Sequence, residues 1–160
     1  MPRCEAEALV GMLKARGKTL STAESCTGGL IGATVTSVPG SSEVYVGGAI
    51  SYSNEVKESL LGVKAKTLAE HGAVSEETAR EMVVGAMDRF RTGTAIAVTG
   101  IAGPGGATPT KPVGLVYIAV ADGPRTVVCR NVFDGDRDAV REQTVSTACE
   151  LMMELMEGKL

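Results

Sequence analysis

The 160-residue sequence contains no tryptophan, and aromatic residues make up only 3% of it. Proteins that bind nucleic acids usually present a basic stripe together with aromatic side chains that stack on bases. This chain has a net charge of -3 and a pI of about 5.3, and no basic stripe is visible. We therefore expect no nucleic-acid partner. The hydrophobic fraction of 44% is large enough for one core, which aliphatic side chains and methionine must fill.

Histidine and clustered cysteines are also scarce. The only histidine, His71, precedes Gly72 in a predicted last helical turn, where a histidine commonly complements the helix end. The four cysteines show no CxxC pair and no zinc-type spacing. We therefore expect no metal. The sequence has no signal peptide and no apolar run long enough for a membrane span, which predicts a cytoplasmic protein with reduced thiols and no membrane partner.

The length fits a single domain over residues 1–160, in which helical and strand patterns alternate. We expect helices over 4–16, 27–38, 54–62, 65–72 and 75–90, and a last helix from about residue 136. We expect strands over 19–25, 44–52, 94–100, 114–121 and 125–133, the last two paired as a hairpin across Asp122-Gly123. This alternation, with one hairpin, indicates an α/β fold with a mixed sheet covered by helices.

The segment AESCTGG, 23–29, lies between a predicted strand and a predicted helix. Such a junction can surround one side chain with backbone N–H groups, so Ser25 is a candidate nucleophile with a potential oxyanion hole in the amides that follow it. In the alternative interpretation, Ser25 or Thr27 caps the helix and Gly28 and Gly29 serve packing. The flanking residues do not form a GxSxG elbow.

Lys57 is the candidate base, because His71 is poorly placed for a Ser-His-Asp triad. A lysine must lose several pKa units to accept a proton near neutral pH. If Asn54 caps the helix, Lys57 falls in its first turn, where the helix dipole and burial under Tyr45 or Tyr52 would lower its pKa. The alternative is a solvated surface lysine near Glu55 or Glu58.

Two further segments suggest anion binding. The loop from Thr99 to Gly106 is rich in glycine and resembles loops that hold phosphates with backbone amides, although it is neither a Walker A loop nor a full GxGxxG. Arg137 and Arg141 lie four residues apart at a helix start, where they could clamp a phosphate or pair with nearby acids in water.

Taken together, the segments AESCTGG, YSNEVK, HGAVS, TGIAGPGG, KPVG and GDRDAVR closely resemble the CinA C-terminal domain family, from about Lys18 to Val145. The characterised members of that family are nicotinamide mononucleotide deamidases. The resemblance implies a three-layer α/β/α sandwich, pyridine-nucleotide salvage, no cofactor and no metal, and a homodimer. It also suggests the stand-alone form, because the amino-terminal nucleotide-hydrolysing domain of the longer members is not in this sequence.

The resemblance further implies that Ser25 is the nucleophile, Lys57 its base and Tyr52 an assisting residue. The expected substrate-binding residues are Cys26, Thr27, Gly28, Gly29, Thr99, Gly100, Gly103, Arg137 and Arg141. The expected reaction converts nicotinamide mononucleotide to nicotinate mononucleotide and ammonia through an acyl-enzyme. Two alternatives stay open: a non-catalytic nucleotide-binding or adaptor module linked to competence or DNA damage, and an amidohydrolase with another substrate.

Overall fold

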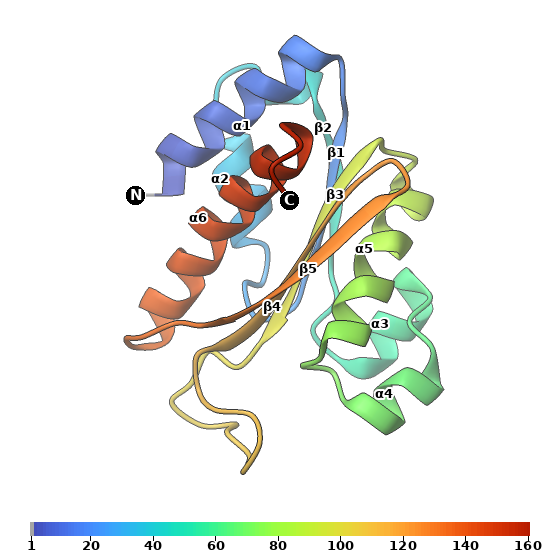
Figure 1. Cartoon of the computed structure of the whole chain (residues 1–160), viewed down its shortest axis with the longest axis vertical. Helices are drawn as coiled ribbons and strands as arrows, with labels where there is room; N and C mark the ends of the chain where they lie inside the picture. Colours follow the sequence, from blue (N-terminus) through green and yellow to red (C-terminus); the bar gives the residue numbers. More distant parts are fainter. Residues whose placement is uncertain (1) are drawn as a thin grey trace.

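A computed structural model describes residues 2–160, which contain a five-stranded mixed sheet in the order β2-β1-β3-β4-β5 (Figure 1). The strands are β1 (Leu20–Glu24), β2 (Tyr45–Ile50), β3 (Thr94–Gly100), β4 (Leu115–Asp122) and β5 (Arg125–Val132). β1 is parallel to both β2 and β3, whereas β4 is antiparallel to β3 and to β5. The expected α/β fold with a mixed sheet is therefore confirmed.

Helices cover both faces of this sheet. α1 (Pro2–Arg16), α2 (Leu30–Thr36) and α6 (Arg137–Met156) lie on one face, and α3 (Asn54–Leu61), α4 (Ala65–His71) and α5 (Glu76–Phe90) lie on the other (Figure 1). A short 3₁₀ turn, η1 (Ser41–Glu43), precedes β2. None of the helices within residues 2–160 has the length and apolar character needed to cross a membrane.

Two aliphatic clusters fill the spaces between the layers. One joins α1, α2 and α6 to the sheet, and the other joins α3 and α5 to its opposite face. β3 lies at the centre, and six of its seven residues are buried because helices cover both of its faces. Its small side chains, TAIAVTG, allow the helices to approach closely, which explains how a core without tryptophan is packed.

Most expected elements agree with the structure to within two residues at each end, but one helix and one turn differ more clearly. The helix expected over 27–38 is only Leu30–Thr36, because Gly28 and Gly29 adopt positive φ and form a turn before it. The hairpin turns at Gly123-Pro124, since Asp122 still pairs with Arg125. Gly123 has a φ of 58°, a conformation that glycine adopts without steric cost.

The sheet topology brings three chain segments to one edge. Because β1 is parallel to β2 and β3, the carboxyl ends of these three strands point the same way, with Glu24 beside Ile50 and Val98. The segments that follow them are the turn after Glu24, the approach to α3 and the long loop between β3 and β4. In parallel sheets, ligand sites commonly form at the carboxyl ends of the strands.

Candidate active site

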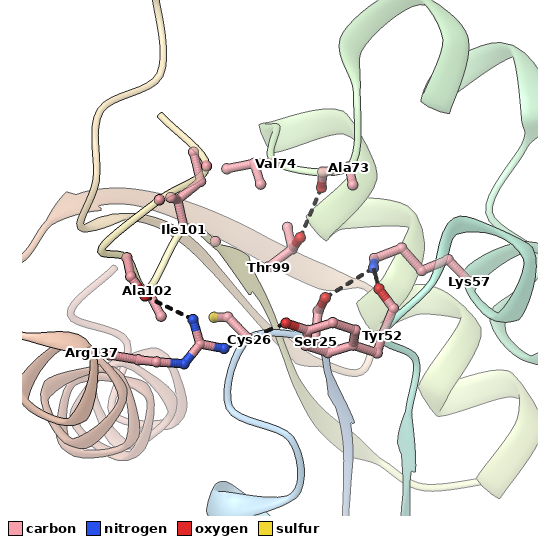
Figure 2. A pocket seen from close by; sticks show the side chains of 14 residues that line it. Ser25, Cys26, Tyr52, Lys57, Ala73, Val74, Thr99, Ile101, Ala102 and Arg137 are labelled. Carbon is pink, nitrogen blue, oxygen red and sulfur yellow. Dashed lines mark hydrogen bonds between the residues drawn. The ribbon is translucent and has the colours of Figure 1, made fainter. Parts of the chain in front are cut away.

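A cavity of about 270 Å³ opens at this edge of the sheet (Figure 2). Its wall consists of Ser25, Cys26, Tyr52, Lys57, Ala73, Val74, Thr99, Gly100, Ile101, Ala102, Gly103, Gly105, Gly106 and Arg137. None of these side chains is acidic, and two of them, Lys57 and Arg137, are basic. The cavity therefore suits a ligand that carries an anionic group and an uncharged, flat or apolar part.

Ser25 and Lys57 meet inside this cavity, although they are 32 positions apart in the sequence (Figure 2). Ser25 follows the last residue of β1, and Lys57 projects from α3. The Nζ atom of Lys57 lies 2.9 Å from Oγ of Ser25, 2.8 Å from the carbonyl oxygen of Ser51 and 3.0 Å from that of Tyr52. The amine is thus fixed by two carbonyl groups and directed at the serine hydroxyl.

Lys57 is one of the most deeply buried side chains, with only 1% of its surface exposed. Burial lowers the pKa of its ammonium group below the usual 10.5, because a charged amine loses hydration there. No carboxylate within residues 2–160 forms an ion pair with it. The alternative of a solvated surface lysine is therefore wrong.

Burial lowers the pKa of Lys57 as expected, but the start of α3 differs from our expectation. Ser53, not Asn54, caps α3: its hydroxyl accepts a hydrogen bond from the Val56 amide at 3.2 Å. Lys57 consequently lies one position further into the helix than expected, and desolvation has the largest effect on its pKa. Tyr45 does not cover Lys57, because its ring packs against the cluster beneath α1, α2 and α6, on the opposite face of the sheet from α3.

Tyr52 contributes to the site through two different groups. Its backbone carbonyl accepts a hydrogen bond from Lys57, while its hydroxyl lies 3.4 Å from a guanidinium nitrogen of Arg137 (Figure 2). The hydroxyl makes no contact with Lys57. The side chain is 64% exposed, so its ring forms an open wall of the cavity.

The turn after Ser25 has fewer open amides than the sequence led us to expect. The Gly28 amide donates to the Ser25 carbonyl at 3.1 Å, and the Gly29 amide donates to a carboxylate oxygen of Glu24 at 3.2 Å. Both amides are therefore already engaged and do not face a ligand. No oxygen within residues 2–160 accepts from the amides of Cys26 or Thr27, and of these two residues only Cys26 lines the cavity.

Cys26 is a second possible nucleophile because it lies beside Ser25 and lines the same cavity. Burial raises the pKa of its thiol to about 11. A thiol of that pKa stays protonated near neutral pH, and the thiolate is the reactive form. The local chemistry therefore favours Ser25, whose hydroxyl has an adjacent amine to accept its proton.

The loop that follows β3 forms the opposite wall of the cavity. Thr99, Gly100 and Gly103 line it together with Gly105 and Gly106, as expected for a loop that contacts a ligand. The Thr99 hydroxyl donates a 2.8 Å hydrogen bond to the Ala73 carbonyl, so its proton is already engaged within the protein (Figure 2). The loop therefore presents mainly its backbone to the cavity.

The two arginines at the start of α6 have different surroundings. Arg137 lines the cavity and donates a 2.8 Å hydrogen bond to the Gly103 carbonyl, which leaves part of its guanidinium beside Tyr52. Arg141 instead donates to the carbonyl oxygens of Cys26 and Thr27, at 3.2 and 2.9 Å, and lies outside the cavity wall. Arg137 is thus placed to contact a ligand, whereas Arg141 holds the turn that carries Ser25.

Sequence reasoning did not single out three residues that shape this site. Glu24 accepts hydrogen bonds from the turn after Ser25, Ser51 supplies a carbonyl to Lys57, and Ala73 supplies a carbonyl to Thr99. Ser51 and Ala73 act through their backbone carbonyls, which are the same in every residue and cannot be recognised from the sequence. Glu24 was detectable in principle, because it is an acidic residue at the end of a strand just before a helix start.

His71 ends α4 as expected, and its ring lies near Glu70 and Glu77 outside the cavity. Within residues 2–160, no three side chains of His, Cys, Asp or Glu come together in a group that could hold a metal ion. The four cysteines are free. The cavity wall itself carries the hydroxyl of Ser25, the thiol of Cys26, the ring of Tyr52, the amine of Lys57 and the guanidinium of Arg137.

The fold and the cavity define a class of protein: an α/β protein in which a buried lysine contacts a serine at the carboxyl edge of the sheet. The model of the CinA C-terminal domain matches residues 4–156, and the chain belongs to that family. The chain is 43% identical over 153 residues to a CinA-like protein of Thermotoga maritima, and 52% identical over 139 residues to one of Citrifermentans bemidjiense. These alignments cover 96% and 87% of this chain.

Solved structures agree with this assignment. The competence/damage inducible protein CihA from Agrobacterium tumefaciens is 42% identical, with a TM-score of 0.94 over 97% of this chain and 95% of that one. A CinA superfamily protein from Escherichia coli is 30% identical, also with a TM-score of 0.94, over 97% of this chain and 90% of that one. The chain spans only 37% and 34% of the Thermotoga and Citrifermentans proteins.

Proposed function

We propose that this chain is an amidohydrolase that converts nicotinamide mononucleotide to nicotinate mononucleotide and ammonia, with Ser25 as nucleophile and Lys57 as general base. The observation that carries the proposal is the 2.9 Å contact between Nζ of buried Lys57 and Oγ of Ser25 on the wall of a cavity. A module that only binds nucleotides has no need of a buried amine aimed at a hydroxyl.

The surroundings of Lys57 favour the protonation state that a base requires. A neutral amine has two N–H donors and one lone pair. The carbonyl oxygens of Ser51 and Tyr52 can only accept, so they take both N–H groups. The lone pair is then left for the third neighbour, the hydroxyl of Ser25. Burial, which lowers the pKa of Lys57, favours the same neutral form.

The proposed reaction begins when Lys57 accepts the proton of Ser25 and Oγ bonds to the carboxamide carbon. The resulting oxyanion would be stabilised by the Cys26 amide, which has no oxygen partner within residues 2–160. The carbon–nitrogen bond then breaks, and Lys57 returns its proton to the departing ammonia. Water attacks the acyl-enzyme, Lys57 accepts a proton from it, and the acid is released as Ser25 regains its hydrogen.

The choice of nicotinamide mononucleotide rests on the family resemblance, and two features of the cavity support it. Arg137 offers a cation for the ribose phosphate, and the glycine-rich loop from Thr99 to Gly106 offers backbone that can approach an anion closely. A second hollow of about 590 Å³ adjoins the first and shares Ala102 and Arg137 with it. Its wall includes Asp136 and Asp138, so it offers room for the uncharged sugar, while the phosphate would stay beside Arg137.

The proposal is tested by measuring ammonia release from nicotinamide mononucleotide, free nicotinamide and the intact dinucleotide. We expect the mononucleotide to be the best substrate. We expect Arg137→Ala to raise its KM by roughly 10- to 100-fold, because a charge-assisted hydrogen bond is lost. The control is Arg130→Ala, which alters an exposed arginine of β5 outside the cavity. Equal use of nicotinamide and the mononucleotide, or an unchanged KM in Arg137→Ala, contradicts the substrate assignment.

A further inference from the structure

Glu24 is a buried carboxylate that the proposed reaction does not use. It is the last residue of β1 and is 2% exposed. Its oxygens accept four hydrogen bonds, from the hydroxyl of Thr27 at 2.6 Å and from the amides of Gly29, Ile31 and Gly32 at 3.2, 2.9 and 3.0 Å. No arginine, lysine or histidine within residues 2–160 forms an ion pair with it. Its burial is therefore compensated by the neutral donors of one short segment.

These four donors belong to the turn that carries Ser25 and to the start of α2. The N-cap residue of α2 is Gly29, which has no side chain to cap the helix. The Glu24 carboxylate takes over that role from the neighbouring strand. Gly28 and Gly29 both have positive φ, so this turn depends on outside contacts to hold one conformation.

Glu24 also connects the two halves of the Ser25–Lys57 pair. Its backbone carbonyl accepts hydrogen bonds from the Ser51 amide at 2.7 Å and from the Ser51 hydroxyl at 3.0 Å. The carbonyl of Ser51 in turn accepts a hydrogen bond from Lys57. The side chain of Glu24 therefore holds the turn that carries Ser25. Its backbone carbonyl holds Ser51, whose own carbonyl contacts Lys57.

The opposite side of the turn is held by Arg141, which donates to the carbonyl oxygens of Cys26 and Thr27. Because a peptide unit is planar and trans, fixing a carbonyl oxygen also fixes the direction of the next amide. Glu24 therefore holds amides of this segment from one side, and Arg141 holds its carbonyl groups from the other. The amides of Gly29, Ile31 and Gly32 donate to Glu24, so they are not available to a ligand.

We propose that Glu24 is a positioning residue whose carboxylate holds the turn after β1, so that Oγ of Ser25 stays within hydrogen-bond distance of Lys57. This inference rests on the proposed role of Ser25 as nucleophile. A displacement of about 1 Å at a reacting group can lower turnover roughly 100-fold, so loose tethering of Ser25 should be measurable in kcat. Substrate affinity should change little, because Glu24 does not line the cavity.

The test is Glu24→Gln, which keeps the shape of the side chain but replaces one acceptor oxygen by an NH₂ group. That group cannot accept from the amide or hydroxyl it faces, so at least one of the four hydrogen bonds is lost. The first readout is the rate at which a fluorophosphonate labels Ser25, followed by intact-mass spectrometry and peptide mapping. The labelling rate measures the reactivity of Ser25 and does not depend on which natural substrate the protein uses. The second readout is kcat and KM for ammonia release from nicotinamide mononucleotide.

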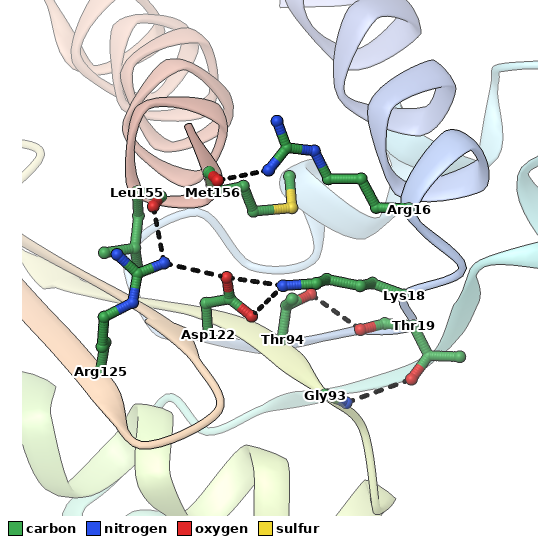
Figure 3. Close-up of polar contacts among 9 residues, drawn as sticks. All are labelled: Arg16, Lys18, Thr19, Gly93, Thr94, Asp122, Arg125, Leu155 and Met156. Carbon is green, nitrogen blue, oxygen red and sulfur yellow. Dashed lines mark hydrogen bonds and ion pairs between the residues drawn. The ribbon is translucent and has the colours of Figure 1, made fainter. Parts of the chain in front are cut away.

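We expect Glu24→Gln to lower both the labelling rate and kcat by roughly 10- to 100-fold while KM stays close to that of the parent. The matched control is Asp122→Asn, at the far end of β4 (Figure 3). Asp122 is also a buried carboxylate, and it pairs with Lys18 at 2.6 Å and Arg125 at 3.2 Å. Asp122→Asn should lower thermal stability but leave labelling and kcat unchanged.

A third variant keeps the inference testable if Glu24→Gln does not fold. Thr27→Val removes only one of the four donors and should lower labelling in the same direction by a smaller factor. Parent-like labelling and kcat in folded Glu24→Gln, or in Thr27→Val if Glu24→Gln does not fold, overturn the inference. So does an equal fall in Asp122→Asn, which would show an effect of stability alone.

The outcomes also separate this inference from the proposed function. If the parent is labelled at Ser25 but releases no ammonia from nicotinamide mononucleotide, the substrate assignment fails, and a slowed labelling of Glu24→Gln still supports the inference. If the parent is neither labelled nor active, the nucleophile assignment fails, and the role of Glu24 is overturned with it.

Discussion

The buried amine of Lys57 should make the stability of the fold depend on pH. Burial lowers the pKa of Lys57 in the folded chain, whereas the unfolded chain should show a value near 10.5. Between these two values the unfolded chain binds one more proton than the folded chain, so the free energy of unfolding rises with pH. Below the folded pKa the full cost of burying the charge applies, and above 10.5 that cost is gone.

The magnitude follows from the number of protons involved. One proton of difference gives a slope of at most about 1.4 kcal/mol per pH unit. The reference is Lys57→Met, which keeps an unbranched side chain of similar length but has no amine. The thiol of Cys26, whose pKa rises from 9.0 to about 11 on burial, gives a slope of opposite sign between these two values. The same thiol is present in the parent and in Lys57→Met, so its contribution cancels in the difference between them.

The assay is urea unfolding followed by far-ultraviolet circular dichroism, because the chain has no tryptophan to report unfolding by fluorescence. We expect the stability of Lys57→Met relative to the parent to be larger at neutral pH than near pH 10.5, and to shrink as the pH rises toward the pKa of an exposed lysine. Lys66→Met is the control, since the Lys66 side chain is 81% exposed and should give no such trend. A difference that is independent of pH, or that grows with pH, would refute the reasoning.

Two further predictions concern the surroundings of Lys57. Tyr52→Phe keeps the carbonyl that holds Lys57 and removes only a hydroxyl 3.4 Å from Arg137, so kcat for ammonia release should fall less than about 10-fold. A loss as large as that of a Lys57 variant would contradict this and show that the hydroxyl takes part in proton transfer. Gly85→Ala should destabilise the fold by about 1–3 kcal/mol, measured by urea unfolding, because the added Cβ would overlap the carbonyl of Leu61 at the end of α3. Since α3 carries Lys57, kcat should fall as well, and an unchanged stability would show that α3 and α5 pack less closely than described.

The periodic parts of the fold could be predicted from the sequence because their patterns are long and consistent. The apolar run 94–100 predicts β3 over its full length, and α6 begins at Arg137, next to the predicted start near residue 136. The segment 27–38 was less well assigned, since a strand-to-helix junction with two glycines can be either turn or helix. Gly28 and Gly29 form the turn, because the carboxylate of Glu24 begins the helix after them.

The candidate site was predictable only where side chains carry the contacts. Ser25 and Lys57 were singled out in the sequence, and the parallel strands bring their segments together. The carbonyls of Ser51 and Tyr52 were not predictable, because backbone groups are the same in every residue. The roles of Arg137 and Arg141 could not be separated either, since one helical turn decides which of them reaches the cavity.

The most direct test of the account is ammonia release from nicotinamide mononucleotide by the parent, Ser25→Ala and Lys57→Met, with folding of each checked by circular dichroism. We expect release by the parent and a loss of at least about 100-fold in both variants, because each removes one partner of the reacting pair. Release by folded Ser25→Ala at the parent's rate would contradict the central claim that Ser25 is the nucleophile. No release by a well-folded parent would contradict the proposed activity itself.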